Sequence, residues 1–158
     1  MAGEARPELI AFVGLGANLG DPQAMLRWAL DALAHTSGVR LVQASALYRS
    51  APVDASGPDF VNAVAKIATT LNAMALLSAL QAIENTAGRE RPYRNAPRTL
   101  DLDLLLFGDA QIDSPTLTVP HPRMRKRAFV LLPLRDVWPE GVPDHRLHDV
   151  SHQSVRPV

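Results

Sequence analysis

Two aspartates two residues apart, Asp101 and Asp103, lie in the apolar run "RTLDLDLLLFGD" (98–109). In a β-strand alternate side chains point to one face, so both carboxylates should project together while the intervening leucines enter the core. Two like charges this close repel, so a positive group is expected between them. Carboxylate oxygens suit Mg²⁺, which commonly shares its coordination sphere with water and phosphate. The spacing therefore predicts a magnesium site, and the alternative is a pair of solvent-facing aspartates on an edge strand.

Arginines gather on both sides of this segment. Of the sixteen basic residues, only Lys66 and Lys126 are lysines. One cluster falls within ten residues and another within five: Arg89, Arg91, Arg94 and Arg98, then Arg123, Arg125, Lys126 and Arg127. Guanidinium groups donate in pairs to phosphate oxygens. Beside metal-binding carboxylates they predict a polyphosphate clamp, whereas in isolation they would be ordinary solvated side chains.

Other candidates for binding each have a plain structural alternative. His121 stands between two prolines, which restrict its backbone and aim its side chain, but a lone histidine in a turn is often only a surface residue. Gln81 and Glu84 are spaced i, i+3 and share one face of a predicted helix, which could equally be exposed surface.

A second set of candidates suits a flat heterocycle. Phe60 and Asn62 lie two residues apart on a predicted strand and would supply a ring for stacking and an amide for hydrogen bonds. Phe129 could form a second stacking wall. From the residues alone, core packing is the stronger explanation of these side chains.

Several familiar sites are absent from the sequence. "GLGANLG" (14–20) has Leu19 where a dinucleotide fingerprint requires glycine, and no P-loop motif occurs. The chain has no cysteine, which excludes disulfides and thiolate metal sites. His145, His148 and His152 are better explained as part of a polar tail than as a metal site.

The elements that must position these residues can be predicted from hydrophobic periodicity and capping signals. A strand (9–16) precedes a helix that starts at Asp21–Pro22 and stops at Gly38, and a strand (39–50) follows. After a loop (51–58), the pattern predicts a strand (59–70), a helix (72–88) and the aspartate-bearing strand. The order βαββαβ is typical of an α+β, ferredoxin-like fold, in which helices pack on one face of an antiparallel sheet. From about residue 110 a C-terminal extension is expected, with a turn, a short helix and irregular structure.

Bulk composition limits the class of protein. The chain has 158 residues, 47% hydrophobic and 20% charged, which predicts one globular domain over 1–158. Its net charge is zero, so attraction to nucleic acid or membranes is not expected. The N-terminus does not resemble a signal peptide, and a cytoplasmic location is expected. Nothing indicates an obligate oligomer, so we expect a monomer.

Three segments, "APRTLDLDLLLFGD", "LTVPHPRMRKRAFVLLPL" and "GLGANLGD", together resemble the 6-hydroxymethyl-7,8-dihydropterin pyrophosphokinases, a family of the folate pathway. The resemblance runs from about Ile10 to Pro139. It implies an ATP-dependent diphosphotransferase that converts ATP and the hydroxymethyl-dihydropterin into AMP and a pterin diphosphate. It also implies two Mg²⁺ ions, held by Asp101 and Asp103, that bridge the phosphates of ATP.

The resemblance also assigns the other site residues. Those implied around ATP are Gln81, Glu84, Arg89, Arg91, Arg98, His121 and Arg127. Those implied around the pterin are Ser50, Val53, Phe60, Asn62, Asp101 and Phe129. Asp101, Asp103, Arg89 and Arg98 would be the catalytic set, and the loops 50–58 and 89–97 correspond to segments that close over ATP.

The sequence departs from the family at a few positions. Many members carry a tryptophan where this chain has Asn95–Ala96, and both loops are one residue shorter here. Phe60 stands where tyrosine is frequent, which removes a hydroxyl and keeps the stacking face.

Two other functions are compatible with parts of this pattern. One is a non-catalytic ferredoxin-like module that binds RNA or a nucleotide, although the few aromatic residues form no RNA-binding pattern. The other is a different nucleotidyl or phosphoryl transferase with the same metal chemistry, which the identity of the product would distinguish.

Overall fold

The computed structural model describes residues 6–52, 57–89 and 100–158, with the backbone alone for Arg89. Its elements follow one another in this order: β1 (Leu9–Ala17), α1 (Pro22–Ala34), β2 (Val39–Ala44), β3 (Tyr48–Ser50), β4 (Phe60–Thr69), α2 (Ala73–Arg89), β5 (Asp101–Phe107), β6 (Ile112–Asp113), β7 (Thr118–Val119), the 3₁₀ turn η1 (Met124–Lys126), α3 (Ala128–Val137), the 3₁₀ turn η2 (Pro139–Gly141), α4 (Asp144–Asp149) and β8 (Val155–Pro157).

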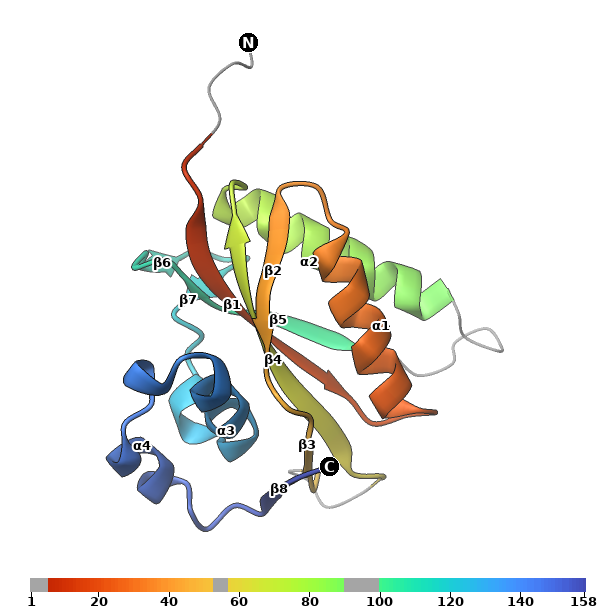
Figure 1. The fold of residues 1–158 in the computed structure, drawn as a ribbon, viewed down its shortest axis with the longest axis vertical. Coiled ribbons are helices and arrows are strands. Elements are labelled where there is room, and N and C mark those ends of the chain that lie inside the picture. The colour runs from red at the N-terminus through yellow and green to blue at the C-terminus, as the bar shows by residue number, and fades with distance from the viewer. Residues whose placement is uncertain (1–5, 53–56, 90–99) are drawn as a thin grey trace.

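The main sheet is antiparallel and combines with helices in an α+β arrangement (Figure 1). Its strand order is β5-β1-β4-β3-β8, and β2 also pairs with β4. The prediction of one continuous strand over 39–50 is wrong, because the strand is interrupted between β2 and β3. At the break Ser45 is buried, and its hydroxyl accepts a hydrogen bond from the Val64 amide (2.9 Å). A side chain thus replaces a backbone acceptor of the ladder and ends the strand.

Side-chain caps fix the starts of the two long helices. Asp21 and Asn72 each accept a hydrogen bond from the backbone amide three residues on, at 3.1 Å and 2.8 Å. Both predicted caps are therefore confirmed. The predicted ends are less accurate: α1 stops before Gly38, which lies at φ +81° in the turn into β2, and α2 continues past Gly88.

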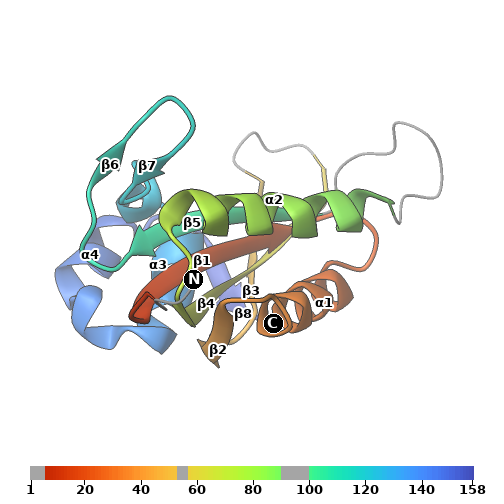
Figure 2. The same ribbon diagram turned by 90° about the horizontal axis from the view of Figure 1, so that it is seen from above.

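Helices cover both faces of the sheet (Figure 2): the two helices of the predicted βαββαβ unit share one face, as expected, and a helix of the C-terminal extension covers the other face, which was not predicted. Helices α1 and α2 pack on one face, where Val13, Ile67 and Leu104 are buried. Helix α3 packs on the other face, against Phe12 and Leu105. Neighbouring residues of one strand, such as Leu104 and Leu105, therefore enter opposite cores. The space beside α3 on the second face is where the candidate site forms.

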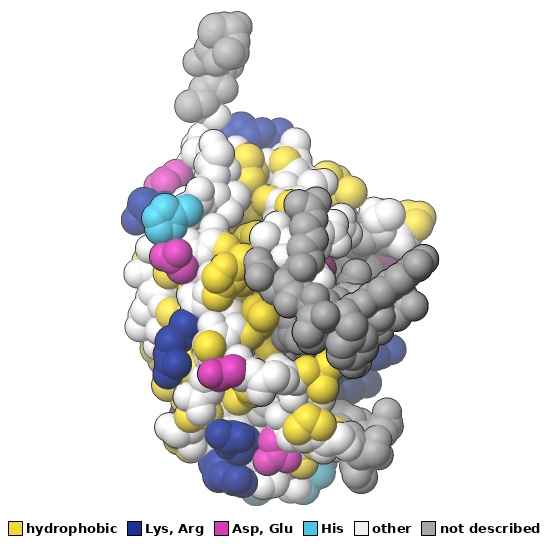
Figure 3. Space-filling model, turned by 90° about the vertical axis from the view of Figure 1, so that its right-hand side faces the viewer, with side chains coloured by type: hydrophobic (Ala, Val, Ile, Leu, Met, Phe, Trp, Pro, Cys, Tyr) yellow, Lys and Arg dark blue, Asp and Glu magenta, His cyan; other side chains and the backbone are white. Residues whose placement is uncertain are grey.

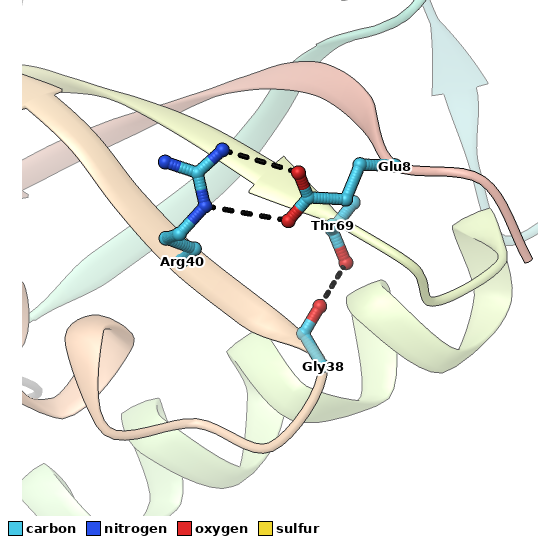
Figure 4. Close-up of polar contacts among 4 residues, drawn as sticks. All are labelled: Glu8, Gly38, Arg40 and Thr69. Atoms are coloured by element: carbon cyan, nitrogen blue, oxygen red, sulfur yellow. Dashed lines mark hydrogen bonds and ion pairs between the residues drawn. The ribbon is translucent and has the colours of Figure 1, made fainter. Parts of the chain in front are cut away.

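Polar contacts tie the layers together at the periphery. The Tyr48 hydroxyl donates to the carboxylate of Asp136 on α3 (2.8 and 3.0 Å), and burial together with this bond raises the pKa of Tyr48 to about 12. Glu8 and Arg40 form a two-bond ion pair, and Thr69 donates to the Gly38 carbonyl (2.7 Å), as Figure 4 shows. The ion pair is exposed and contributes little to stability.

Candidate active site

Three adjacent strands provide the floor of the site. On β5 the two aspartates alternate with leucines: Asp101 and Asp103 are exposed, whereas Leu102 and Leu104 are 6% and 3% exposed. The predicted alternation is therefore confirmed. Pairing register places Gly16 of β1 opposite both Asp101 and Asn62 of β4. Since neighbouring strands are spaced by just under 5 Å, the Asp101 and Asn62 backbones lie roughly 10 Å apart across the glycine strand.

A cavity of about 430 Å³ lies over this floor. Its polar or aromatic lining residues include seven of the residues predicted to bind ligand: Ser50, Phe60, Asn62, Asp101, Asp103, Arg127 and Phe129. The volume and the mixture of aromatic, amide and charged groups suit a small, flat, polar ligand. The fold thus brings together in one place residues that are up to 79 positions apart in the chain, from Ser50 to Phe129.

Asn62 is the buried polar centre of the cavity. Its side chain is 6% exposed, and its Oδ1 accepts a hydrogen bond from the Ser50 hydroxyl (2.7 Å). This bond fixes the plane of the amide. Its Nδ2 lies on the side of Gly16, where a ligand in the cavity can accept from it.

The absence of a side chain at Gly16 keeps this region open. A Cβ added at Gly16 would lie 3.2 Å from Asn62 Nδ2, closer than ordinary contact, whereas a Cβ at Gly14 would meet Leu105 at an ordinary 3.5 Å. In the sequence these glycines indicate only an incomplete dinucleotide motif, and their place in the cavity wall was not predicted. Two glycines spaced by two on a central strand were the available signal, because they remove side chains from one face.

We expect Gly16→Ala to raise the KM for the small-molecule acceptor about fivefold, because the added methyl displaces the Asn62 amide by a few tenths of an ångström. Gly14→Ala is the matched control and should change KM less than twofold, since its methyl makes only van der Waals contact. Steady-state kinetics of both variants measures the difference. Equal effects of the two substitutions would contradict the proposed contact.

Aromatic and cationic side chains form the walls. Phe60 and Phe129 are half-buried and line the cavity from β4 and α3. The guanidinium of Arg127 lies 5.3 Å from the centre of the Phe129 ring, a favourable cation–π distance. The two rings offer stacking surfaces, and Arg127 brings positive charge to the same edge.

His121 lies close to these charges. Its backbone amide donates to the Leu105 carbonyl (2.9 Å), and its Nδ1 accepts from the Arg123 amide (3.2 Å). Since Nδ1 is an acceptor, the hydrogen of the neutral ring is on Nε2, which is left to donate to a ligand. Burial lowers the pKa of His121, the Asp103 charge raises it, and the charges of Arg127 and Arg123 lower it, with a net decrease.

His121 should therefore titrate below the ordinary histidine value of 6.5 in the metal-free protein. Its contribution to the free energy of unfolding is present above pH 6.5 and is lost as the pH falls through the lowered pKa, because the unfolded state then binds more protons. Two-dimensional NMR of the ring measures this pKa. Arg127→Ala should raise it and Asp103→Asn should lower it further, and shifts of the opposite sign would contradict the electrostatic assignment.

Other predicted residues lie apart from the cavity lining or outside the described residues. Gln81 is exposed on α2, and Glu84 accepts a hydrogen bond from the Leu102 amide (2.8 Å), which holds α2 to the aspartate strand. Arg91, Arg98 and Val53 fall outside the described residues, as does the side chain of Arg89.

The donor set of the cavity suits a hard cation. Two carboxylates face the same side, and within the described ranges no group of three or more His, Cys, Asp or Glu residues could hold a metal. Mg²⁺ needs few protein ligands when phosphate and water supply the rest, so the two aspartates fit it. None of the described helices has the length and apolar character to cross a membrane. On the face drawn in Figure 3, basic and acidic side chains are interspersed, in keeping with the zero net charge.

Comparison with known families agrees with these features. Residues 12–139 match the model of the family described as 7,8-dihydro-6-hydroxymethylpterin-pyrophosphokinase (HPPK). The match contains β4, β5 and α3 and most of β1.

Curated relatives carry the corresponding name. The 2-amino-4-hydroxy-6-hydroxymethyldihydropteridine pyrophosphokinase of Pseudomonas aeruginosa is 50% identical over 142 residues, which cover 89% of this chain and 85% of the relative. That of Pseudomonas putida is 53% identical over 114 residues, 72% of this chain and 95% of the relative. The folic acid synthesis protein fol1 of Schizosaccharomyces pombe is 35% identical over 97% of this chain, which spans 20% of that protein.

Solved structures show the same fold at low identity. An HPPK-DHPS crystal structure in complex with substrates has a TM-score of 0.69 at 13% identity, and the match covers 85% of this chain and 40% of that one. Plasmodium falciparum HPPK-DHPS with pterin and p-hydroxybenzoate gives a TM-score of 0.67 at 16% identity, with 87% and 41% coverage. The chain therefore spans about two fifths of these larger proteins.

Proposed function

The chain belongs to the 7,8-dihydro-6-hydroxymethylpterin pyrophosphokinase family, and from that premise we propose how its own residues carry out the reaction. It is an ATP-dependent diphosphotransferase of folate biosynthesis: it transfers diphosphate from ATP to the hydroxymethyl group of 6-hydroxymethyl-7,8-dihydropterin. AMP and the pterin diphosphate are the products. The assignment of individual residues is our proposal.

One observation carries the proposal: Asp101 and Asp103 share one cavity with Asn62, across a strand that bears glycine between them. A pterin held by Asn62 would place its hydroxymethyl group toward the aspartates, because roughly 10 Å separates the two strands and the ring spans most of that distance. The acceptor hydroxyl and the metal-bound phosphate can then meet without rearrangement of the floor.

Asp101 and Asp103 are proposed to hold two Mg²⁺ ions. When bound, the ions screen the negative charge of the triphosphate so that the pterin hydroxyl can attack the β-phosphorus, with AMP as the leaving group. Asp101 and Asp103 contribute a fixed pair of carboxylates, whose direction is set by the buried leucines that alternate with them along the strand. Asp101 also lies where it can contact the attacking hydroxyl, although we assign no general base.

The pterin is proposed to stack between Phe60 and Phe129, with its edge on Asn62 and Ser50. Buried hydrogen-bonding groups such as the Asn62 amide discriminate strongly against ligands that leave them unpaired. Val53 is proposed to add a backbone contact.

The triphosphate is proposed to lie near Arg127, which brings positive charge to the edge of the cavity, and near His121, which lies outside the cavity lining but close enough to Asp103 and Arg127 to interact with their charges. Nε2 of neutral His121 can donate to a phosphate oxygen at neutral pH, because its pKa is lowered. The remaining proposed ATP contacts are Gln81, Glu84, Arg89, Arg91 and Arg98. Positioning and electrostatic stabilisation would then supply most of the rate.

We further propose that residues 1–158 form one ferredoxin-like domain that acts as a cytoplasmic monomer. The central order β5-β1-β4 with β2 and β3 beyond β4 supports the topology, as does the βαββαβ order from β1 to β5 when β2 and β3 are counted as one interrupted strand.

Product analysis tests the proposed reaction. The protein is incubated with ATP, Mg²⁺ and reduced hydroxymethylpterin, and AMP and pterin diphosphate are quantified by chromatography. The two should appear in equal amounts. ADP would indicate an ordinary kinase, free diphosphate would indicate nucleotidyl transfer, and either would overturn the proposal.

A further inference from the structure

The C-terminal segment packs against two walls of the site, although it lies beyond the family match that ends at residue 139. Strand β8 pairs antiparallel with β3, with Val155 opposite Ser50, the residue that holds Asn62. Figure 1 shows β8 beside β3 at the lower end of the sheet. The segment is thus in direct contact with the pterin side of the cavity.

The side chain of Gln153, just before β8, hydrogen-bonds to the backbone on both sides of Arg127. Its Nε2 donates to the Lys126 carbonyl (2.8 Å), and its Oε1 accepts from the Ala128 amide (2.8 Å). Both functional atoms of the side chain are therefore used on the two peptide units that flank one residue of the cavity wall.

The backbone needs this support at Arg127. The residue is extended (φ −126°, ψ 112°) between the 3₁₀ turn η1 and α3, so it belongs to neither element. Ala128 is the first residue of α3, and its amide has no acceptor within the helix. N-cap side chains usually satisfy such amides, but Arg127 makes no capping bond, and Gln153 supplies it from 25 residues away.

We infer that Gln153 is a positioning residue for Arg127 and Phe129: its two hydrogen bonds fix the turn from which both side chains enter the cavity. A second cavity, of about 540 Å³, is lined by Gln153 and shares Arg127 and Phe129 with the first, so these two side chains have open space on either side. Phe129 packs against the edge of the second core, but both side chains stay partly exposed, so the backbone restraint helps to set their direction. This inference rests on the roles proposed above for Arg127 and Phe129.

The test compares Gln153→Met, which keeps the size and loses both bonds, with Gln153→Glu, which keeps the acceptor and loses the donor. Gln111→Met, at an exposed position on the β5–β6 loop, is the matched control. For each variant, hydrogen exchange of the Ala128 amide is measured by NMR, and kcat/KM for the pterin is measured under saturating Mg-ATP.

In Gln153→Met the Ala128 amide hydrogen should exchange with solvent at least about tenfold faster than in the wild type. The same substitution should lower kcat/KM for the pterin about tenfold. Gln153→Glu should fall between wild type and Gln153→Met in both measurements, and Gln111→Met should match wild type. If Gln153→Met does not fold, Gln153→Glu decides by the same two readouts.

Faster exchange with unchanged kinetics would show a bond that positions nothing and would overturn the inference. An unchanged exchange rate would show that the hydrogen bonds of Gln153 do not form in solution, and this result would also overturn the inference. A lower unfolding temperature alone, with wild-type kinetics, would assign Gln153 a purely structural role. Failure of the wild-type protein to form AMP would instead refute the proposed function, and the exchange data would remain interpretable without it.

Discussion

Asp101→Asn and Asp103→Asn are each expected to lower kcat at least about 1,000-fold, since several kcal/mol of charge stabilisation depend on the metal that they hold. The amide keeps the shape of the side chain but loses the negative charge that binds a hard cation. Both side chains are exposed, so neither substitution leaves a buried group unpaired, and both variants should stay folded. The loss should therefore appear in catalysis and in Mg²⁺ affinity, without a change in folding.

Asp109→Asn is the matched control, because Asp109 is also exposed and lies in the turn just after the same strand. It should retain wild-type kinetics. Rates of AMP formation across a Mg²⁺ titration distinguish weakened metal binding from a general defect. A variant at either Asp101 or Asp103 that keeps more than a tenth of the wild-type rate would contradict the metal assignment.

Asn62→Leu is expected to raise the KM for the pterin about 100-fold and to change kcat much less. The substitution removes a hydrogen bond to the pterin that is equally strong in the ground state and in the transition state. Asn62 is buried, with 6% of its surface exposed, and leucine keeps the branched shape of its side chain. The substitution also leaves the buried Ser50 hydroxyl without the acceptor that it has at 2.7 Å. Some loss of stability is therefore expected together with the loss of binding.

A double-mutant cycle separates these two effects. Ser50→Ala alone should raise KM about fivefold, since the amide loses the bond that fixes its plane, and it should add little to Asn62→Leu. Asn85→Leu, on the exposed surface of α2, controls for the change of residue type. Additive effects of Ser50→Ala and Asn62→Leu would show that the hydroxyl does not act through the amide.

The parts of the fold that could be predicted from sequence are those in which local signals agree with the tertiary structure. The alternation along 100–104 correctly predicted that the leucines point inward and the aspartates outward, because one buried face fixes the register of a strand. Asp21 and Asn72 cap their helices as expected, because capping depends on only a few neighbouring residues.

The wrong predictions concern contacts between distant segments. The break at Ser45 depends on a bond to Val64, 19 residues away, that no local pattern reports. A short helix was expected after residue 110, but the packing of α3 on the second face was not predicted, because its partners Phe12 and Leu105 lie far away in the sequence.

The candidate site shows the same division. Phe60, Asn62 and the aspartates were recognisable as residue types, but without the resemblance nothing local joined them. The role of Gly16 depends on its cross-strand neighbour, and that of Gln153 on a turn 25 residues earlier. The roles assigned to Val53, Arg91 and Arg98 stay predictions, because these residues lie outside the described part of the chain.

The most direct test of the central claim is a crystal structure with Mg²⁺, a non-hydrolysable ATP analogue and 6-hydroxymethylpterin. We expect metal ions bound by carboxylate oxygens of Asp101 and Asp103, with the pterin between Phe60 and Phe129 and its edge on Asn62. Metal ions coordinated elsewhere, or a pterin outside this cavity, would contradict it.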